Sequence, residues 1–380
     1  MPGDCPRRTS RRARRDYTDA VIANVGLIVA GLVLLVVGGE GLVRGASALA
    51  RRIGMSALVV GLTVVSVATS APELAVTTGA VLGGETDLAV GNVVGSNTAN
   101  VLLILGVGGL LAPLVVKRAI ILRDLPVMLA LSLVLLIMAM SGTITRTNGI
   151  VLLALFVAVT AFAVWMGRTD EPEPQVEAEP PAPVWRAGLF ILVGVAALVG
   201  GAQLLVTGAV GIATSLGVSK LVIGLTVVSI GTSLPELAAT VVAVRRGEVD
   251  MAVGNVVGSN IANIGLVLGL PATLASGGIA VPPSSVALDI PLMIAATVAL
   301  LVMCYTGREI ARWEGLIMLG LYLAYVAYMV IASTDHDSLR GFTLVMVWFV
   351  LPVIGLLLFA TFARQFRKDA RVIAADSARD

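Results

Sequence analysis

Apolar residues run through this chain in long stretches that short polar segments interrupt. A stretch of about 20 apolar residues is long enough for a helix to cross the hydrocarbon core of a bilayer. The stretches of this kind are residues 20–39, 56–83, 87–112, 119–140, 148–167, 187–207, 219–245, 250–276, 285–304, 313–332 and 342–363. The pattern therefore predicts an all-α membrane protein with ten spanning helices and an additional eleventh at the C-terminal end.

The composition supports a membrane protein and argues against a soluble domain. Charged residues make up 13% of the chain, and the mean hydropathy is +0.98. A soluble domain carries about 25% charged residues. The two cysteines, Cys5 and Cys304, and the single histidine, His336, lie far apart in the sequence. Their spacing indicates neither a disulfide framework nor a metal cluster, and we expect no cofactor.

The chain also contains one pattern twice. Residues 61–106 and 224–269 align without a gap at an offset of 163, and 32 of the 46 positions are identical. The identities gather on two polar motifs within apolar helices, Thr-Ser-x-Pro-Glu and Gly-Ser-Asn-x-x-Asn. Each repeat holds five predicted helices, an odd number, so the second repeat should enter the membrane in the opposite orientation. Two inverted copies of a polar site within membrane helices indicate a transporter.

The repeats set the expected domain boundaries. Five prolines and five acidic residues between Arg168 and Val184 are typical of a linker, because such a segment cannot form an apolar core. The predicted units are a basic N-terminal tail (1–19), the first repeat (20–167), the linker (168–186), the second repeat (187–334), and the extra helix with a basic tail (335–380).

Lys and Arg in the loops predict the orientation in the membrane, since cytoplasmic loops carry more of them. With the N-terminus outside, five inside loops and the C-terminal tail collect most of these residues. The arginine-rich N-terminal tail argues for the opposite orientation. Because the loop evidence is spread over several segments, we expect a multi-pass protein of the cell membrane with its N-terminus outside and its C-terminus inside.

The strongest candidates for function are Glu73 and Glu236, which lie about midway along their predicted helices. An ionised carboxylate at that depth is costly unless it is paired, hydrated or bound to a cation. The only Lys or Arg residues in these two helices are Lys220 and Arg245, at the two ends of the second helix, so no basic partner is available near either glutamate in the chain. A protonated glutamate in an interhelical hydrogen bond is the alternative, but the repeated motif favours a functional site.

The neighbouring residues would supply further oxygen atoms. Pro72 and Pro235 lack an N–H, so each should kink its helix and free backbone carbonyls around residues 66–69 and 229–232. In the second motif a serine and an asparagine four residues apart share one helix face. These pairs are Ser96 with Asn100 and Ser259 with Asn263.

Carboxylate, hydroxyl, amide and carbonyl oxygens without sulfur or imidazole favour hard cations, so Ca²⁺, Na⁺ and H⁺ are preferred over zinc or copper. Two glutamates together carry two negative charges, which one Ca²⁺, two Na⁺ or two protons would neutralise. A loaded site is tolerated in the membrane better than an empty, doubly charged one. The charge balance therefore favours exchange over leak.

The paired motifs resemble the two α-repeats of the cation/Ca²⁺ exchanger superfamily, which includes sodium/calcium exchangers. The resemblance covers residues 20–332 and rests on Gly-Thr-Ser-Leu-Pro-Glu-Leu and Gly-Asn-Val-Val-Gly-Ser-Asn. It implies a ten-helix fold with four central ion sites, bridged by Glu73 and Glu236. The further ligands that it implies are Thr69, Ser70, Thr232, Ser233, Ser96 and Ser259, with Ser66 and Ser229 contributing backbone carbonyls.

The chain departs from that family's pattern at Asn263 and in the run 342–363, which adds an eleventh span. Several members carry Asp where Asn263 stands here, so this chain lacks a possible third carboxylate and K⁺ co-transport is disfavoured. Asp124 and Asp289 each precede an X-Pro pair, and we expect them to be helix N-caps and not ligands.

We expect an antiporter that exchanges Ca²⁺ for Na⁺ by alternating access, with H⁺ as the alternative coupling ion. The expected partners are these ions and the lipid bilayer, and no nucleic acid. A cation channel would need a continuous polar pore, whereas the polar residues here concentrate at one depth. An intramembrane enzyme would need a nucleophile–base pair, which these helices do not offer.

Overall fold

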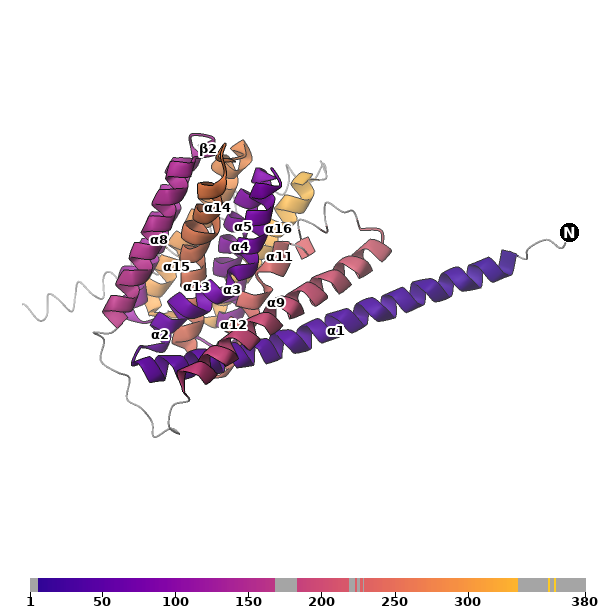
Figure 1. The fold of residues 1–380 in the computed structure, drawn as a ribbon, viewed down its shortest axis with the longest axis horizontal. Coiled ribbons are helices and arrows are strands. Elements are labelled where there is room, and N and C mark those ends of the chain that lie inside the picture. The colour runs from indigo at the N-terminus through magenta and orange to yellow at the C-terminus, as the bar shows by residue number, and fades with distance from the viewer. Residues whose placement is uncertain are drawn as a thin grey trace, which may run out of the picture.

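The computed structural model describes residues 6–167, 183–218, 223, 226–227, 229–333, 355 and 359. These residues are almost entirely helical (Figure 1). Within them, eight helices are long and apolar enough to cross a membrane, or nine if the bent pair Ala57–Thr69 and Ala71–Leu82 counts as one span. The predicted helix 219–245 is described only in part, and the predicted helix 342–363 lies almost wholly outside the described residues. The count of ten helices and an eleventh therefore stays a prediction.

The elements of the first repeat alternate α-helices with short π-helical turns, labelled η. In chain order they are α1 (Pro6–Ile53), α2 (Ala57–Val60), η1 (Gly61–Val65), α3 (Ser66–Thr69), α4 (Ala71–Leu82), α5 (Thr86–Ala99), η2 (Asn100–Ile104), α6 (Leu105–Leu111), β1 (Leu114–Val115), η3 (Ile120–Asp124), α7 (Leu125–Ala139), β2 (Thr143–Ile144) and α8 (Arg146–Gly167).

The described part of the second repeat follows the same order. Its elements are α9 (Val184–Ser215), α11 (Ser229–Thr232), α12 (Leu234–Arg245), α13 (Val249–Ala262), η5 (Asn263–Leu268), α14 (Gly269–Leu274), β3 (Ile279–Ala280), η6 (Ser285–Asp289), α15 (Ile290–Gly307), β4 (Glu309–Ile310) and α16 (Arg312–Ser333). The π-helical turns η2 and η5 begin at equivalent positions of the two repeats, so the repetition in sequence extends to backbone geometry.

The centre of the bundle is formed by the two helical stretches that carry the Gly-Ser-Asn-x-x-Asn motifs. In the most apolar part of Thr86–Leu111, 78% of the residues are buried, and in that of Val249–Leu274, 94% are buried. The corresponding share is only 17% in α8 and in α16, which lie at the periphery. Large exposed apolar side chains such as Val29, Ile137 and Leu192 form the outer surface, as expected where lipid is the solvent.

Helices α1 and α9 lie side by side along much of their length (Figure 1) and approach each other through glycines. A Cβ atom on Gly31 would lie 2.7 Å from the carbonyl oxygen of Gly201, and one on Gly38 would lie 2.8 Å from that of Gly194. From Gly31 to Gly38 the position on α1 increases, while the contacting position on α9 decreases from Gly201 to Gly194. The two helices therefore run antiparallel. The glycines allow backbone to pack directly on backbone, as small residues do in membrane helices.

Two short antiparallel bridges connect the repeats. Strand β1 pairs with β4 through Leu114 and Ile310, and β2 pairs with β3 through Thr143 and Ala280. Each pair joins a loop of the first repeat to a loop of the second. The repeats are therefore linked outside the helical core as well as within it.

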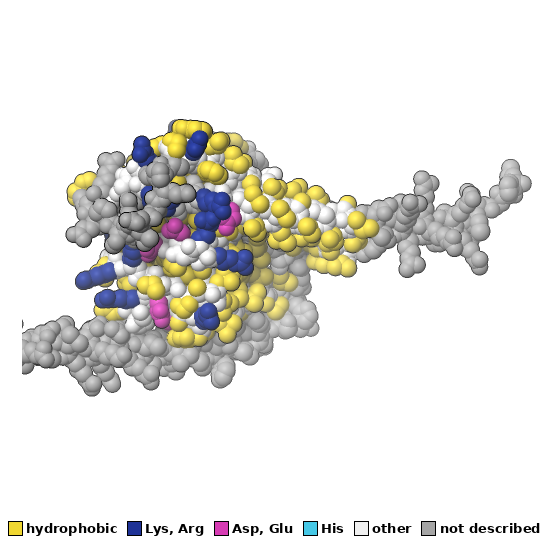
Figure 2. Space-filling model, turned by 90° about the horizontal axis from the view of Figure 1, so that it is seen from below, with side chains coloured by type: hydrophobic (Ala, Val, Ile, Leu, Met, Phe, Trp, Pro, Cys, Tyr) yellow, Lys and Arg dark blue, Asp and Glu magenta, His cyan; other side chains and the backbone are white. Residues whose placement is uncertain are grey.

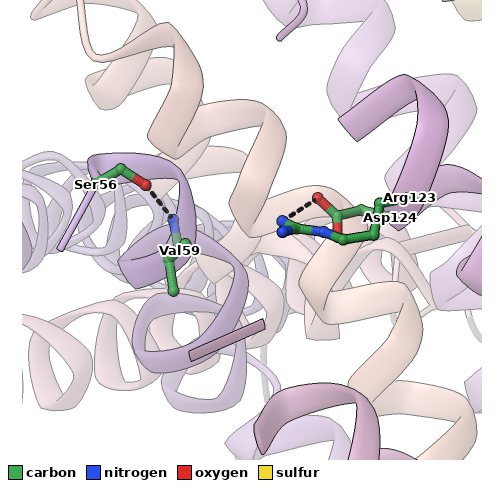
Figure 3. Close-up of polar contacts among 4 residues, drawn as sticks. All are labelled: Ser56, Val59, Arg123 and Asp124. Atoms are coloured by element: carbon green, nitrogen blue, oxygen red, sulfur yellow. Dashed lines mark hydrogen bonds and ion pairs between the residues drawn. The ribbon is translucent and has the colours of Figure 1, made fainter. Parts of the chain in front are cut away.

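Polar contacts mark the beginnings of two helices (Figure 3). The Ser56 side chain accepts a hydrogen bond from the Val59 N–H and caps α2 as an N-cap residue should. The predicted capping role of Asp124 is wrong, because its carboxylate instead binds the Arg123 guanidinium at 2.7 and 3.0 Å. Asp289 likewise accepts a hydrogen bond from Ser285 and makes no side-chain cap. Both helices continue backward into η3 and η6, so their N–H groups at this point are already bonded.

Lys and Arg side chains gather on one end of the bundle, which Figure 2 shows from below. Several charged contacts on this end join α1 to the turn between α12 and α13. The Arg246 guanidinium binds the Glu40 carboxylate at 2.6 Å, Arg44 approaches the same oxygen at 3.3 Å, and Ser47 donates to Glu248 at 3.0 Å. We call Glu40, Arg44, Ser47, Arg246 and Glu248 the charged network.

Candidate ion-binding site

Each Thr-Ser-x-Pro-Glu motif interrupts a helix, as the prolines predict. Helix α3 ends at Thr69 and α4 begins at Ala71, with a bend of 43° between the two parts of the span. Ser70 at the break has φ −78° and ψ 4°, and its counterpart Ser233, between α11 and α12, has φ −87° and ψ 4°. The predicted kinks are therefore confirmed. Each break leaves the N-terminal end of a helix, α4 or α12, in the interior of the protein.

Both glutamates lie in the first turn of the helix that follows the break. Glu73 is 0% exposed and Glu236 is 1% exposed. The N-terminal end of a helix carries a partial positive charge, which favours a carboxylate at this position. Neither oxygen of Glu73 has a hydrogen-bond partner among the described residues, and neither does Oε2 of Glu236.

Hydroxyl groups of the same motifs surround the glutamates. The Ser70 hydroxyl lies 3.5 Å from Oε1 of Glu236 and so connects the motif of one repeat to the glutamate of the other. Thr69, Ser70 and Ser233 are buried, and Thr232 is half-buried. The hydroxyl oxygens of Thr232 and Ser233 have no partner within the described part of the chain. The two motifs therefore contribute to one site.

The Gly-Ser-Asn-x-x-Asn motifs add oxygens from α5 and α13. Ser96 and Ser259 are buried, with hydroxyl oxygens that no described group satisfies. The amide of Asn100 donates to Oδ1 of Asn260 at 3.1 Å, and that of Asn263 donates to Oδ1 of Asn97 at 3.0 Å. These bonds use the nitrogen atoms and leave Oδ1 of Asn100 and of Asn263 unpaired.

The unpaired atoms define the candidate site. Over the described residues, nine buried side-chain nitrogen or oxygen atoms lack a hydrogen-bond partner, and all nine are oxygens. All belong to residues that the sequence predicts as ligands: Glu73, Ser96, Asn100, Thr232, Ser233, Glu236, Ser259 and Asn263. Buried polar atoms are nearly always paired, so a concentration of unpaired oxygens requires an explanation such as a bound ion.

The remaining predicted ligands are differently placed. The Ser66 carbonyl is not freed by the kink, because it accepts a hydrogen bond from the Ser70 N–H at 3.0 Å. The Ser66 hydroxyl donates to the Leu62 carbonyl at 2.6 Å. The side chain of Ser229 lies outside the described residues, although its backbone begins α11. The roles of Ser66 and Ser229 as carbonyl ligands stay predictions.

The structure also brings residues to the site that the motif analysis missed. Asn92 donates to the Thr77 hydroxyl at 2.9 Å, and Asn255 donates to the Thr240 hydroxyl at 3.3 Å. The two pairs are related to each other by the offset of 163, and each asparagine precedes the serine of its motif by four residues. The helical period of the motif, extended one turn backward, would have found both asparagines.

A second missed feature is the backbone at the motif asparagines. Asn100 is the first residue of η2 and Asn263 is the first residue of η5. Short π-helical turns within α-helices occur frequently at functional sites. Because the turn changes the direction in which the following residues point, it contributes to the position of the amide. No pattern of residue types in the sequence predicts such a turn.

The donor set is made of oxygen. No group of three or more His, Cys, Asp or Glu side chains comes together in the part of the chain that the structure describes. The site instead combines two carboxylates with hydroxyl and amide oxygens, which suit hard cations.

Broken helices from two repeats that meet within a bundle of apolar helices define a membrane transporter of the secondary, gradient-driven class. Comparison with known proteins agrees with this class. Residues 23–165 and 186–331 match the model of the sodium/calcium exchanger protein family, and the chain belongs to this family.

Individual relatives extend over most of the chain. The inner membrane protein YrbG of Escherichia coli K12 is 37% identical over 70% of this chain and 84% of its own length. The sodium/calcium exchanger MaX1 of Methanosarcina acetivorans is 33% identical over 70% of this chain and 87% of its own length. A solved structure of the sodium-calcium exchanger NCX_Mj superimposes with a TM-score of 0.71 at 29% identity, covering 81% of this chain and 99% of that one.

Proposed function

We propose that this protein is a secondary antiporter that exchanges Ca²⁺ for Na⁺ across a membrane. The observation that carries the proposal is the cluster of nine unpaired buried oxygens between the two repeats. Its relatives include proteins that are named as sodium/calcium exchangers, which supports the same ions here.

The charges of the site fit these ions. Glu73 and Glu236 are both buried and have no Lys or Arg among the partners that the structure gives them. One Ca²⁺ or two Na⁺ would balance two ionised carboxylates, and the hydroxyl and amide oxygens would replace water around the ion. An empty site would keep two negative charges within the membrane, which is unfavourable. The site therefore favours a transport cycle in which bound Ca²⁺ is replaced by bound Na⁺, and bound Na⁺ by Ca²⁺, without a long-lived empty state.

The inverted repeat supports alternating access as the mechanism. Two repeats of opposite orientation can present one central site first to one side of the membrane and then to the other. The twelve predicted ligand residues would then share the bound ions among adjacent sites, with Glu73 and Glu236 contributed by the two broken helices.

Protons are a second candidate for the coupling ion. The unpaired oxygens of Glu73 and Glu236 can accept protons as well as metal cations. A pair of protons would balance the two carboxylates as two Na⁺ would.

Calcium flux into vesicles tests the proposal. The full-length protein is reconstituted into liposomes, and uptake of radiolabelled calcium is measured with an outward Na⁺ gradient at equal pH, and with a pH gradient in choline. Uptake that requires the Na⁺ gradient is expected. Uptake that follows only the pH gradient would replace Na⁺ by H⁺ as the coupling ion. Calcium uptake without either gradient at an imposed voltage would indicate a channel and overturn antiport.

A further inference from the structure

The hydroxyl of Thr69 lies between several acceptors at the edge of the candidate site. Its oxygen is 3.2 Å from Oδ1 of Asn255 and 3.3 Å from the Ser66 carbonyl oxygen. The Glu236 carboxylate is close to this part of the chain, because the hydroxyl of the next residue, Ser70, lies 3.5 Å from its Oε1. A threonine hydroxyl has one proton and two lone pairs. It can therefore donate to only one of these acceptors at a time.

Asn255 is held in the orientation that presents its oxygen to Thr69. Its side-chain nitrogen donates to the hydroxyl of Thr240 at 3.3 Å, and both residues are buried. Thr240 lies on α12 four residues after Glu236, on the same helix face. Asn255 therefore connects a predicted ligand of the first repeat to the helix that carries the glutamate of the second.

The equivalent contact is not formed by the other copy of the motif. Asn92 donates to the Thr77 hydroxyl and to the Glu73 carbonyl oxygen at 3.3 Å. Thr232, the counterpart of Thr69, has no hydrogen-bond partner among the described residues. The amide–threonine contact is thus not an automatic result of the repeated fold.

We propose that Asn255 is a positioning residue for the cation site. When a cation occupies the Glu236 carboxylate, the Thr69 hydroxyl donates its proton to Oδ1 of Asn255 and turns a lone pair toward the cation. Without this acceptor, the hydroxyl proton points toward the carboxylate and opposes a positive charge there. The proposal rests on the proposed cation site and adds a residue outside its ligand set.

A pair of double-mutant cycles tests this role. Asn255→Leu removes the acceptor, and Thr69→Val removes the hydroxyl while keeping its size. Each should raise the half-saturating Ca²⁺ concentration about tenfold, as loss of a residue that orients a ligand does. The double variant should be no worse than either single variant, because Asn255 acts through Thr69. The matched cycle pairs Asn255→Leu with Thr240→Val.

The two cycles separate a positioning role from a structural one. Coupling of Asn255 to Thr69 supports the proposal. Additive effects at Asn255 and Thr69, or coupling of Asn255 to Thr240 alone, would show that Asn255 only stabilises helix packing. If Asn255→Leu does not give a folded protein, Asn255→Asp takes its place. It keeps an acceptor for the Thr69 proton and should not weaken Ca²⁺ binding, so a tenfold loss there would contradict the proposal.

Measuring ion binding distinguishes a failure of the role proposed for Asn255 from a failure of the proposed function. Binding of radiolabelled calcium is measured on the purified full-length protein, and binding of radiolabelled sodium is measured in parallel. If the wild-type protein binds only Na⁺, the calcium assignment fails while the cycles remain measurable with Na⁺. If the wild type binds Ca²⁺ and the cycle with Thr69 shows no coupling, only the role of Asn255 fails.

Discussion

At the scale of single residues, the two buried glutamates dominate the site. A carboxylate oxygen within a low-dielectric interior needs a hydrogen-bond donor, a proton or a cation. Three of the four glutamate oxygens lack a partner among the described residues. We expect Glu73→Gln and Glu236→Gln each to lower Ca²⁺ exchange about 100-fold or more, since each removes a charged ligand.

The measurement is calcium flux into liposomes that contain equal amounts of folded, inserted protein. Glu85→Gln is the matched control, because Glu85 is an exposed acidic residue just beyond α4. Normal flux in either buried variant would remove the proposed site. Equal loss in the control would point to damage unrelated to the buried carboxylates.

The asparagines of the site give a second expectation. With Asn at both 100 and 263, the site has two carboxylates, and Ca²⁺ exchange should not depend on K⁺. Replacing K⁺ by choline at fixed Na⁺ and pH should leave the flux unchanged. Asn263→Asp would add a third carboxylate, and closely packed like charges hold a proton more readily. This variant should make exchange more sensitive to pH, and Asn100→Asp is its repeat-related comparison.

The repetition in the sequence identifies the residues that carry the unpaired buried oxygens, and their role as ligands stays a prediction. The two copies of each motif identify polar positions within apolar helices, and in the part of the chain that the structure describes every unpaired buried oxygen belongs to one of these positions. The helical period places Asn255 and Asn92 on the face of the motif serines, but which hydroxyl each asparagine contacts depends on the folded structure. That contact joins residues far apart in the chain, such as Thr69 and Asn255, and spacing within one helix does not reveal it.

At the scale of elements, the glycine contact between α1 and α9 allows a sharp comparison of neighbouring positions. A Cβ atom on Gly201 would lie 2.8 Å from the Gly31 carbonyl oxygen, whereas one on Gly200 would meet no atom within 4 Å. Gly201→Leu should therefore separate the helices, and Gly200→Leu should not.

Overpacking of this kind destabilises a protein by about 1–3 kcal/mol. The expected result is a lower midpoint of thermal unfolding in detergent for Gly201→Leu than for the wild type, with Gly200→Leu close to the wild type. Equal midpoints for both variants would mean that α1 and α9 do not pack through this contact in the membrane protein.

Helix positions follow from the apolar pattern, while helix geometry does not. The kinks at Ser70 and Ser233 were predicted because proline removes an N–H. The π-helical turns were not, because they depend on how a helix is packed. The same turns explain the wrong prediction for Asp124, since η3 already bonds the N–H groups that a cap would satisfy.

At the scale of the whole molecule, the gathering of Lys and Arg on one end predicts which side faces the cytoplasm (Figure 2). Single cysteines introduced at exposed Arg118 and at exposed Glu85 should be labelled from opposite sides of the membrane. We expect the cysteine at position 85 to react with an impermeant reagent outside the cell. Reaction of position 118 from outside would reverse the predicted orientation.

The ion pairs of the charged network have no copy on the other side of the molecule. The positions that the offset of 163 assigns to Glu40, Arg44 and Arg246 are the uncharged Gln203, Thr207 and Gly83, and only Glu248 has a charged counterpart, Glu85. In an alternating-access cycle, an exactly symmetric inverted repeat would give two resting conformations of equal free energy, related by the pseudo-two-fold axis. The ion pair between Glu40 and Arg246 joins α1 to the turn between α12 and α13 on one face, and we expect it to favour the conformation in which that face is closed.

Partly exposed ion pairs contribute about 0–1 kcal/mol each, so the preference is modest. Glu40→Gln should still shift the ratio of half-saturating Ca²⁺ concentrations at the two faces by about two- to fivefold, and high salt should shift the wild type the same way. Flux measured in sorted vesicles of each orientation checks this, with Glu309→Gln as the control on the same end. We therefore expect a few surface charges, and not the ion site, to decide which side of the membrane the empty carrier faces at rest.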